Sequence, residues 1–373
     1  MFTPLIEESP GFLNLKKKVI DSGLCSLCGS CGLLCDKIEY KDLPSLGEGT
    51  PCFITSGAKT CGTLGCCYDN CPMTSFSKKE LEIAYFGNKA SDPDLGVYRK
   101  ILSARSTDKE ILTRAQNGGT ITSLLTYTLS GYPPENRYKG VILTKKGEAW
   151  IPTPFFASKP EELLLSTGSI YSRLPLSNQI RSLLRKKKNL IFVGTGCQTT
   201  GVRKYQYNFL NKIPRDSVHI FLIGVFCYEN FPYLQFKAAI QEKSKVLINE
   251  IKKMDINKGK LIITVKDGTF FQYPIKDFNS IVPEACKLCI NFTSELADIS
   301  VGSVGAEDNW NTLIIRSDEG LEIVERAEDR GIIETTTKVS IEAIRKNISR
   351  KRFLSEKIIE KRRINGLYVP TFN

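Results

Sequence analysis

The chain has 373 residues but only one histidine, His219, and this scarcity limits the chemistry available to it. A zinc or copper site with several histidine ligands needs more imidazole groups than the sequence contains. His219 stands directly before the apolar residues 220–224, so we expect it to be an ordinary strand residue. The sequence therefore points away from multi-histidine metal sites and from catalysis by a pair of histidines.

Long apolar runs are also lacking, and none is long enough to cross a bilayer. The opening MFTPLIEESPGFLNLKKK places acidic residues before its lysines and contains no secretory core. We therefore expect a cytoplasmic protein that does not span a membrane, although a partner could hold it at one.

The formal net charge of +12 is concentrated toward one end of the chain. Residues 338–373 contain 10 Lys or Arg and 3 Glu, whereas residues 1–90 contain 9 basic and 10 acidic residues. A basic excess suits nucleic acid, an acidic partner protein or an anionic cofactor. The basic tail lacks interleaved aromatic residues and any known nucleic-acid motif, so we expect no nucleic-acid partner.

Cysteine, in contrast, is abundant: the chain has 13, and 9 of them lie between Cys25 and Cys71. In a protein that is not exported, such a number indicates either an unusual disulfide framework or metal ligation. The clustered spacing favours metal ligation.

The first cysteine run, Cys25-Ser-Leu-Cys28-Gly-Ser-Cys31-Gly-Leu-Leu-Cys35, has the C-x2-C-x2-C-x3-C spacing of bacterial ferredoxins. Zinc sites normally use paired knuckles, so four cysteines in one run favour an iron–sulfur cluster. Asp36 replaces the proline that usually follows the fourth cysteine.

A second, less regular run follows, Cys61-Gly-Thr-Leu-Gly-Cys66-Cys67-Tyr-Asp-Asn-Cys71-Pro. In two-cluster ferredoxins the fourth cysteine of each run binds the other cluster. One predicted cluster is therefore held by Cys25, Cys28, Cys31 and Cys71. The other is held by Cys35, Cys61, Cys67 and one of Cys66 or Cys52; a single cluster plus free thiols is the alternative.

Strand and helix patterns alternate after residue 98, which predicts an α/β core. Residues 139–144 (KGVILT), 189–194 (NLIFVG) and 219–224 (HIFLIG) read as buried strands, and 260–273 as a hairpin with an Asp-Gly turn. Helices are expected over 121–129, 161–166 and 176–188. A basic helix over 343–363 is expected to pack Ile348, Leu354, Ile358 and Ile359 inward.

The expected fold is thus a mixed sheet with flanking helices plus a small N-terminal ferredoxin-like α+β iron–sulfur domain. We divide the chain into residues 1–90 (iron–sulfur domain), 91–337 (core) and 338–373 (basic helical tail).

Four more cysteines are distant in sequence: Cys197, Cys227 and the pair Cys286 and Cys289. The first two each follow a predicted buried strand, and the carboxyl ends of parallel strands converge on one crevice. These four side chains are therefore candidates for a third cluster, with buried free thiols as the alternative.

The segments around these cysteines, together with others in the core, make the chain resemble the beta subunit of coenzyme F420-reducing hydrogenase and the wider F420 hydrogenase/dehydrogenase beta family. The similar segments span residues 98–372 and include 116–125 (QNGGTITSLL), 194–204 (GTGCQTTGVRK), 223–233 (IGVFCYENFPY), 253–260, 286–305 and 363–372. Asn117 stands where the family often has Asp, and Gly196 where it often has Pro.

The resemblance implies an F420-dependent oxidoreductase subunit of the kind found in archaeal methanogenesis. FAD would mediate between F420, which transfers hydride, and [4Fe-4S] clusters, which carry single electrons. It implies two N-terminal clusters and one core cluster held by Cys197, Cys227, Cys286 and Cys289, with no catalytic acid–base residue. The implied partner is a hydrogenase, formate dehydrogenase, membrane F420H2 dehydrogenase, heterodisulfide reductase or similar redox subunit. A cluster-only electron-transfer module and a flavin enzyme acting on another ring substrate are the alternatives.

Small-residue loops are the candidates for binding FAD, because backbone N–H groups and a helix N-terminus suit a diphosphate. They are Asn117, Gly118, Gly119 and Thr120; Thr167, Gly168 and Ser169; and Gly302, Ser303 and Gly305. The anionic tail of F420 requires a basic rim, for which the candidates are Arg203, Lys204, Lys258 and Lys260. Trp310 is a candidate to cover the ring system, or else a core residue.

Overall fold

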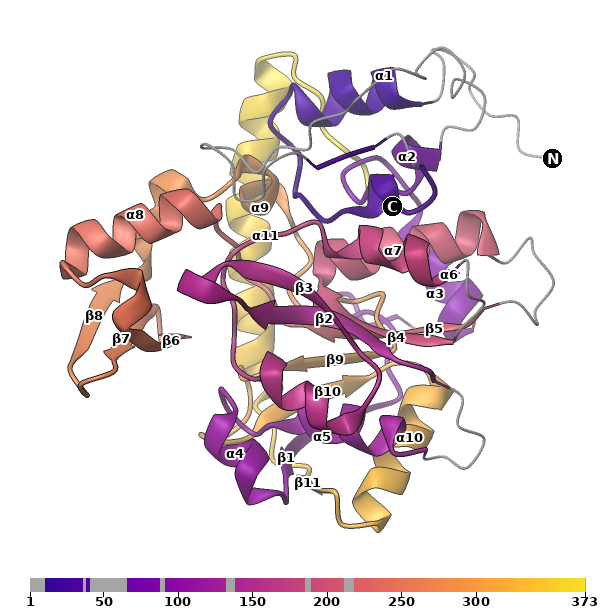
Figure 1. Cartoon of the computed structure of the whole chain (residues 1–373). Helices are drawn as coiled ribbons and strands as arrows, with labels where there is room; N and C mark the ends of the chain where they lie inside the picture. The colour runs from indigo at the N-terminus through magenta and orange to yellow at the C-terminus, as the bar shows by residue number, and fades with distance from the viewer. Residues whose placement is uncertain are drawn as a thin grey trace.

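The computed structural model describes residues 11–35, 38–40, 66–87, 91–131, 138–184, 189–210 and 218–372. An eight-stranded mixed sheet, in the order β11-β1-β10-β9-β5-β4-β2-β3, lies at the centre (Figure 1). Its strands are β1 (Lys100–Ser106), β2 (Val141–Lys146), β3 (Pro152–Ala157), β4 (Leu190–Thr195), β5 (Ile220–Val225), β9 (Ile299–Gly302), β10 (Asn311–Ile315) and β11 (Ile333–Thr336). Strands β2, β4, β5 and β9 run parallel, whereas the outer strands pair antiparallel.

The parallel strands are apolar on both sides because helices cover both faces of the sheet. One face packs Ile191, Phe221 and Ile223 against α5 (Thr120–Leu129) and α10 (Asp318–Asp329). The other packs Phe192 and Leu222 against α7 (Gly196–Asn208) and α6 (Ile180–Leu184). Figure 1 shows these two helical layers on opposite sides of the sheet. The mixed α/β core and its three buried strands, predicted from the sequence, are confirmed.

A smaller antiparallel sheet, in the order β6-β7-β8, projects from the side of the main sheet (Figure 1). Its strands are β6 (Ile251–Asn257), β7 (Lys260–Val265) and β8 (Phe270–Pro274), and the predicted hairpin joins the last two. The strands pack on α8 (Tyr233–Ser244) through Phe236, Met254 and Leu261, and Phe278 of the 3-10 helix η8 (Ile275–Ile281) joins the same cluster.

Two of the predicted helices differ from regular α-helices, one throughout and one in its first turn. The segment at 161–166 is the 3-10 helix η4 (Pro160–Ser166). The segment from residue 176 begins as the 3-10 helix η5 (Leu176–Gln179) and continues as α6, and residues 185–188 lie outside the described chain.

The described N-terminal residues form short helical elements rather than strands. They are α1 (Phe12–Leu15), the π-helix η1 (Lys16–Ile20), the 3-10 helix η2 (Ser30–Gly32), α2 (Cys66–Asp69) and α3 (Lys78–Phe86). Leu15, Leu24 and Met73 share one apolar cluster with Leu288 of α9 (Glu284–Leu288) and with Tyr368. The described N-terminal residues and the C-terminal residues therefore pack together, and residues 41–65 lie outside the described part.

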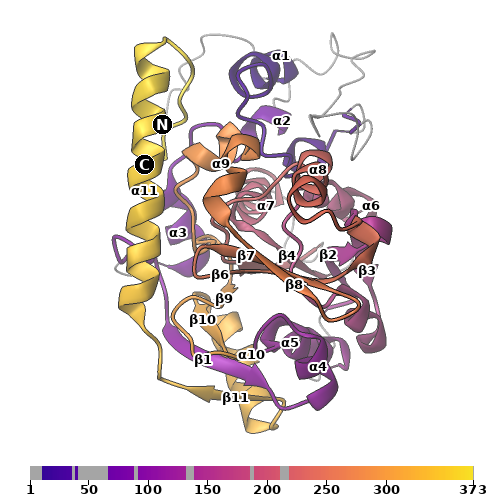
Figure 2. The ribbon, with the colours of Figure 1, turned by 90° about the vertical axis from the view of Figure 1, so that its left-hand side faces the viewer.

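The basic C-terminal segment is the long helix α11 (Ile341–Ile364), which runs along the side of the molecule (Figure 2). Its buried residues, Ile344, Ile348, Lys351, Ser355 and Arg362, recur at helical spacing and form one face. Leu354 is 42% exposed, so the prediction that it packs inward is wrong. Ile358 and Ile359 pack against the N-terminal apolar cluster as predicted, but the most buried residues in the second half of α11 are polar, which apolar periodicity alone does not reveal. Among the helices of the described chain, none is long and apolar enough to cross a membrane.

Helix α7 approaches the N-terminal segment closely at Gly201. A Cβ atom there would lie 1.9 Å from Ser30 Oγ and 2.5 Å from Ser30 Cβ. Alanine normally favours a helix over glycine by about 1 kcal/mol, but here it would displace η2.

We therefore expect Gly201→Ala to lower the unfolding free energy by about 1–3 kcal/mol, as overpacking does. The change is measured by anaerobic thermal unfolding together with limited proteolysis of the N-terminal segment. Adding Ser30→Gly should restore stability by removing the clashing atoms, and Glu242→Ala, at an exposed site on α8, serves as the control. A Gly201→Ala protein as stable as the unchanged one would contradict the contact.

Candidate functional site

The site is built where the parallel strands β4 and β5 end side by side. Thr195 of β4 is in register with Val225 of β5, so the residues that follow both strands reach the same edge of the sheet. Cys197 lies in the first turn of α7, directly after β4, and Cys227 follows β5. Gly196 precedes Cys197, and a Cβ there would lie 2.9 Å from Asn291 Nδ2, so no larger residue fits without a shift.

Helix α9 brings Cys286 and Cys289 to the same edge. The Cys286 thiol points to the carbonyl oxygen of Asn230 at 3.7 Å, and the Cys289 thiol to that of Asn291, also at 3.7 Å. The Cys197 thiol interacts electrostatically with those of Cys227 and Cys286, and the Cys227 thiol with those of Cys286 and Cys289. The four residues form the core cysteine group, which the sequence predicted from strand ends.

A second set of thiols, the N-terminal cysteine group, comprises Cys25, Cys28, Cys31 and Cys71. The Cys31 thiol interacts electrostatically with the other three, and the Cys71 thiol with those of Cys28 and Cys25. The loop that carries them is fixed to the core because Ser177 N–H donates to the Cys28 carbonyl at 3.0 Å. The structure thus brings together one of the two ligand sets expected from the crossed ferredoxin spacing.

Burial is the largest influence on the pKa of four of these thiols, Cys25, Cys31, Cys197 and Cys227. It raises the pKa of Cys25 and of Cys227 to about 12, and it raises the pKa of Cys31 and Cys197 well above the ordinary value. Neighbouring thiols raise the pKa further, because several thiolates close together repel one another. A set of buried thiols can therefore ionise together only when positive charge is supplied.

The two cysteine groups adjoin each other. Cys28 of one group interacts electrostatically with Cys197 of the other. Arg173 lies between them: its guanidinium donates to the Cys25 carbonyl at 3.0 Å and interacts with the thiols of Cys197 and Cys286. A charge placed on either group is therefore felt by the other.

The structure describes only some of the remaining N-terminal cysteines. Cys67 is buried in the N-terminal apolar cluster, Cys35 packs against it, and Cys66 is also buried. Cys52 and Cys61 lie outside the described residues. The ligand set of the second N-terminal cluster therefore stays a prediction.

In the described part of the chain, no three Cys, His, Asp or Glu side chains surround a point as ligands of one metal ion. A cubane cluster places different demands on its ligands, because each thiolate binds a different iron atom and the sulfurs stand further apart. The donor set at each group, four thiols without carboxylate or imidazole, is the one that such a cluster requires.

The predicted loop at residues 117–120 opens α5, as expected. Gly119 has φ +68°, and a Cβ on Gly118 would lie 2.8 Å from the Ala104 carbonyl oxygen, so both positions require glycine. Thr120 is turned into the protein, where its hydroxyl donates to Ala104 O at 2.9 Å. Beside the half-buried Asn117, the amide Nε2 of Gln116 is buried and has no hydrogen-bond partner among the described residues. This orphaned donor is an observation that favours a ligand at this loop.

The other two small-residue loops differ in how closely they are packed. A Cβ on Gly302 would lie 2.0 Å from the Phe226 ring, and Gly305, with φ +97°, packs against Ile344 at the start of α11. Thr167, Gly168 and Ser169 form a partly exposed loop after η4, in which a Cβ on Gly168 would meet no other atom within 4 Å. Close packing therefore explains Gly302 and Gly305 without a flavin.

Two of the four residues predicted for the basic rim are not at the surface. Arg203 is 2% exposed and donates to Asp298 Oδ2 at 3.0 Å, and Lys204 is 4% exposed and donates to the Cys71 carbonyl at 2.7 Å. A buried side chain bound to the protein cannot line a solvent-facing rim, so these two assignments are corrected. Lys258 and Lys260 are exposed at the turn between β6 and β7.

Trp310 and the single histidine have partners of their own. Trp310 is half-buried and carries the Arg105 guanidinium over its ring, 4.8 Å from the centroid. His219 is exposed before β5 and lies 2.9 Å from Glu319 Oε2. The exposed position of His219 agrees with an ordinary strand-end residue.

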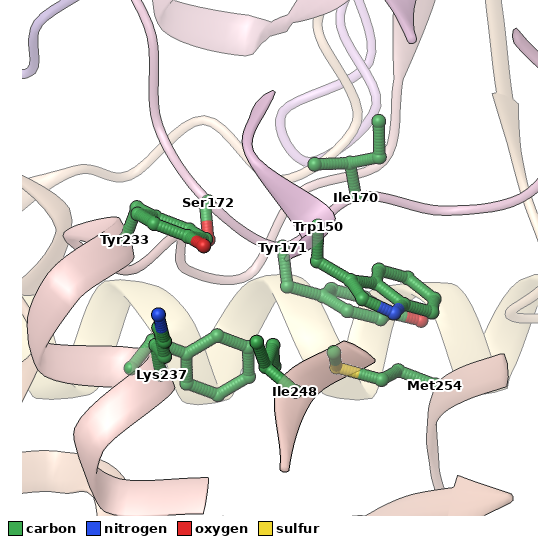
Figure 3. A pocket seen from close by; sticks show the side chains of 9 residues that line it. Trp150, Ile170, Tyr171, Ser172, Tyr233, Lys237, Ile248 and Met254 are labelled. Carbon is green, nitrogen blue, oxygen red and sulfur yellow. The ribbon is translucent and has the colours of Figure 1, made fainter. Parts of the chain in front are cut away.

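A small pocket lies between the three-stranded sheet, α8 and the loop before η5 (Figure 3). Trp150 and Tyr171 lie on one side of it and Tyr233 and Lys237 on the other (Figure 3). Trp150 Nε1 donates to Ile251 O at 3.0 Å, and the Tyr233 hydroxyl donates to Ala149 O at 2.6 Å. Since these polar atoms already have protein partners, the pocket is a mostly apolar seam that holds the smaller sheet to the core.

Family models match most of the core. The model described as "Coenzyme F420 hydrogenase/dehydrogenase, beta subunit N-term" matches residues 101–181, and the one for the C terminus of that subunit matches residues 187–340. The coenzyme F420 hydrogenase beta subunit of Methanothermobacter thermautotrophicus is 36% identical over 284 residues, which is 74% of this chain and 99% of that protein. The chain belongs to the family of coenzyme F420 hydrogenase/dehydrogenase beta subunits.

Other relatives match almost the whole chain. The coenzyme F420-dependent sulfite reductase of Methanocaldococcus jannaschii is 30% identical over 373 residues, which covers 95% of this chain and 53% of that protein. A component of the F(420)H(2) dehydrogenase of Methanosarcina mazei is 28% identical, covering 90% of this chain and 91% of that protein.

The F420-reducing [NiFe] hydrogenase complex from Methanosarcina barkeri contains a chain with TM-score 0.69 and 33% identity, covering 75% of this chain and 97% of that one. These findings confirm the resemblance seen in the sequence.

Replacing Arg203 distinguishes a structural role from a role in binding F420. Arg203→Met would leave Asp298 buried without its partner, and we expect a loss of about 3–5 kcal/mol in unfolding free energy. The loss is measured by anaerobic thermal unfolding; Arg203→Lys should recover part of it. Arg326→Met breaks an exposed pair with Glu322 and should cost less than about 1 kcal/mol. A stable Arg203→Met protein with a raised KM for F420 would contradict a purely structural role for Arg203.

Proposed function

We propose that this chain passes electrons between coenzyme F420 and a partner redox enzyme by means of FAD and [4Fe-4S] clusters. The observation that carries the proposal is the juxtaposition of two four-cysteine groups at the carboxyl edge of the sheet, in a chain that belongs to a family of F420 enzymes. A chain of redox centres needs such neighbouring ligand sets.

The proposed ligands are supported by the geometry of the described cysteine groups and, for the remaining cysteines, by their spacing in the sequence. Cys197, Cys227, Cys286 and Cys289 would hold the core cluster, and Cys25, Cys28, Cys31 and Cys71 the adjoining N-terminal cluster. A third cluster would be held by Cys35, Cys61, Cys67 and one of Cys66 or Cys52. The two described groups each supply four thiols from segments fixed by hydrogen bonds, which suits a cubane with four thiolate ligands.

The FAD site is proposed at the edge next to α5. When bound, a flavin exchanges hydride with F420 and single electrons with an iron–sulfur cluster. The chain would contribute the backbone around Asn117, Gly118 and Gly119, the N-terminus of α5, and the unpaired amide of Gln116. Thr167, Gly168, Ser169 and Ser303 stay candidates to line the site, since their loops are partly exposed.

The remaining contacts are with F420 and the partner. Lys258 and Lys260 are placed to attract the anionic tail of F420, since both are exposed on one turn. The named relatives include components of a hydrogenase and of an F420H2 dehydrogenase, so we propose that a similar redox protein is the partner of this chain. We also propose a cytoplasmic location and three functional parts, residues 1–90, 91–337 and 338–373.

Anaerobic absorption spectroscopy tests the proposal. We expect flavin bands over broad iron–sulfur absorbance, and bleaching of both by F420H2 but not by NADH. Iron and sulfide without flavin would indicate a cluster-only module, and flavin reduced only by another donor would indicate a different ring substrate. Either result would contradict the proposed F420 reaction.

A pair of cysteine variants tests the order of the two groups. In Cys289→Ala, F420H2 should still bleach the flavin bands, whereas the iron–sulfur absorbance should stay largely oxidised, because the group nearest the strand ends has lost a ligand. In Cys28→Ala the core cluster should still be reduced. The two variants are compared by rapid mixing with F420H2 and by iron content. Full reduction of every remaining cluster in Cys289→Ala would contradict the order.

A further inference from the structure

Two lysines are buried beside the cysteine groups, one at each. Lys351 of α11 and Lys204 of α7 are each 4% exposed. The Lys351 ammonium donates to the carbonyl oxygens of Cys227 at 2.7 Å and Asn291 at 3.3 Å. The Lys204 ammonium donates to the carbonyl oxygen of Cys71 at 2.7 Å and to Thr74 Oγ1 at 2.8 Å. Each lysine therefore contacts the backbone of a cysteine of its own group.

Within the described part of the chain, neither ammonium is neutralised by an ion pair. Of the salt bridges formed by the described residues, none includes Lys204 or Lys351. Glu229 interacts electrostatically with Lys351, and Asp69 with Lys204, but neither pair forms a salt bridge. A buried charge that is only hydrogen-bonded to neutral oxygens is costly, so each lysine requires negative charge nearby.

The thiols are the groups placed to supply that charge. Lys351 interacts electrostatically with the thiols of all four cysteines of the core group. Lys204 interacts with the thiols of Cys71 and Cys28 in the N-terminal group. The aromatic rings beside them, Tyr228 at 5.8 Å from Lys351 Nζ and Phe76 at 4.8 Å from Lys204 Nζ, help to keep water away from both ammonium groups.

We propose that Lys351 and Lys204 are the separate countercharges of the two cysteine groups and that each raises the reduction potential of the cluster beside it. This inference rests on the proposed function, because it requires a cluster at each group. Reduction adds one negative charge to a cluster, and a fixed cation in a low-dielectric site favours the more negative state. The two lysines come from different helices and each contacts its own group, so each acts mainly on the cluster beside it.

Both lysines act as positioning residues through charge rather than as ligands. Helix α11 delivers Lys351 to the core group because Ile344 and Ile348, on the same face, anchor the helix against the sheet. Ser355, one turn further, donates to the Leu288 carbonyl between Cys286 and Cys289. The basic C-terminal helix is therefore part of the redox site.

The test is an anaerobic redox titration of the full-length holoprotein, followed by electron paramagnetic resonance. The signals of the two clusters are assigned with Cys289→Ala and Cys28→Ala. We expect Lys351→Met to lower the reduced-to-oxidised ratio of the core cluster roughly tenfold at a fixed potential, a shift of ~59 mV for one electron. Lys204→Met should do the same to the N-terminal cluster. Each variant should shift the other cluster's potential by less than it shifts that of the cluster beside it.

Matched variants separate charge from packing. Lys351→Arg and Lys204→Arg keep the charge and should retain potentials near those of the unchanged protein. Lys357→Met removes an exposed lysine from the same helix and should change neither potential. Should a Met variant lose its cluster while the Arg variant keeps both cluster and potential, the requirement for charge is supported; loss in both variants would show a packing role and overturn the proposal.

Unshifted potentials in Met variants that hold all their iron would overturn the lysine proposal and leave the proposed function intact. Absence of iron and sulfide from the unchanged protein would instead refute the proposed function itself. The two failures are therefore distinguished by iron content alone.

Discussion

The burial of many thiols in one region is the constraint on which the rest of the site depends. Thiolates that are close together and away from water repel one another, so they can ionise jointly only beside positive charge. In the proposed function iron would supply most of that charge, and the buried cations of Lys204, Lys351 and Arg173 lie beside the thiols and would supply the remainder. The same demand explains why long basic side chains point into the interior here, a place where lysine and arginine are rarely found.

The proposed electron transfer needs redox centres at fixed separations, and the packing of the described residues fixes the two cysteine groups relative to each other. The N-terminal segment shares an apolar cluster with α9 and the C-terminal residues, and it contacts α7 where Gly201 allows close approach. Arg362 of α11 donates to Ser22 O at 3.1 Å and to Glu284 Oε1 at 2.6 Å, which joins the N-terminal segment, α9 and α11 at one side chain. The described N-terminal residues are thus held as part of the core rather than as a loosely tethered module.

Much of the core could be predicted from the sequence, because its determinants are local. The runs that form β2, β4 and β5 are apolar on both faces, and the strand-end positions of Cys197 and Cys227 already imply that they meet. Burial of charged residues cannot be predicted in this way. Arg203 and Lys204 have an ordinary basic appearance, and their partners Asp298 and Cys71 are far away in sequence. The burial of Lys351 cannot be predicted from the sequence either, because its partners Cys227 and Asn291 are also far away in sequence. Which face of α11 is buried depends on how the helix packs against the core.

The central claim is that the two adjoining cysteine groups hold two clusters close enough to exchange electrons. The most direct measurement is the electron paramagnetic resonance spectrum of the fully reduced protein. We predict a spectrum broadened by magnetic interaction between neighbouring clusters, and we expect the part of this broadening that involves the core cluster to disappear in Cys289→Ala. Sharp signals without any interaction in the intact protein, or a single cluster in total, would contradict it.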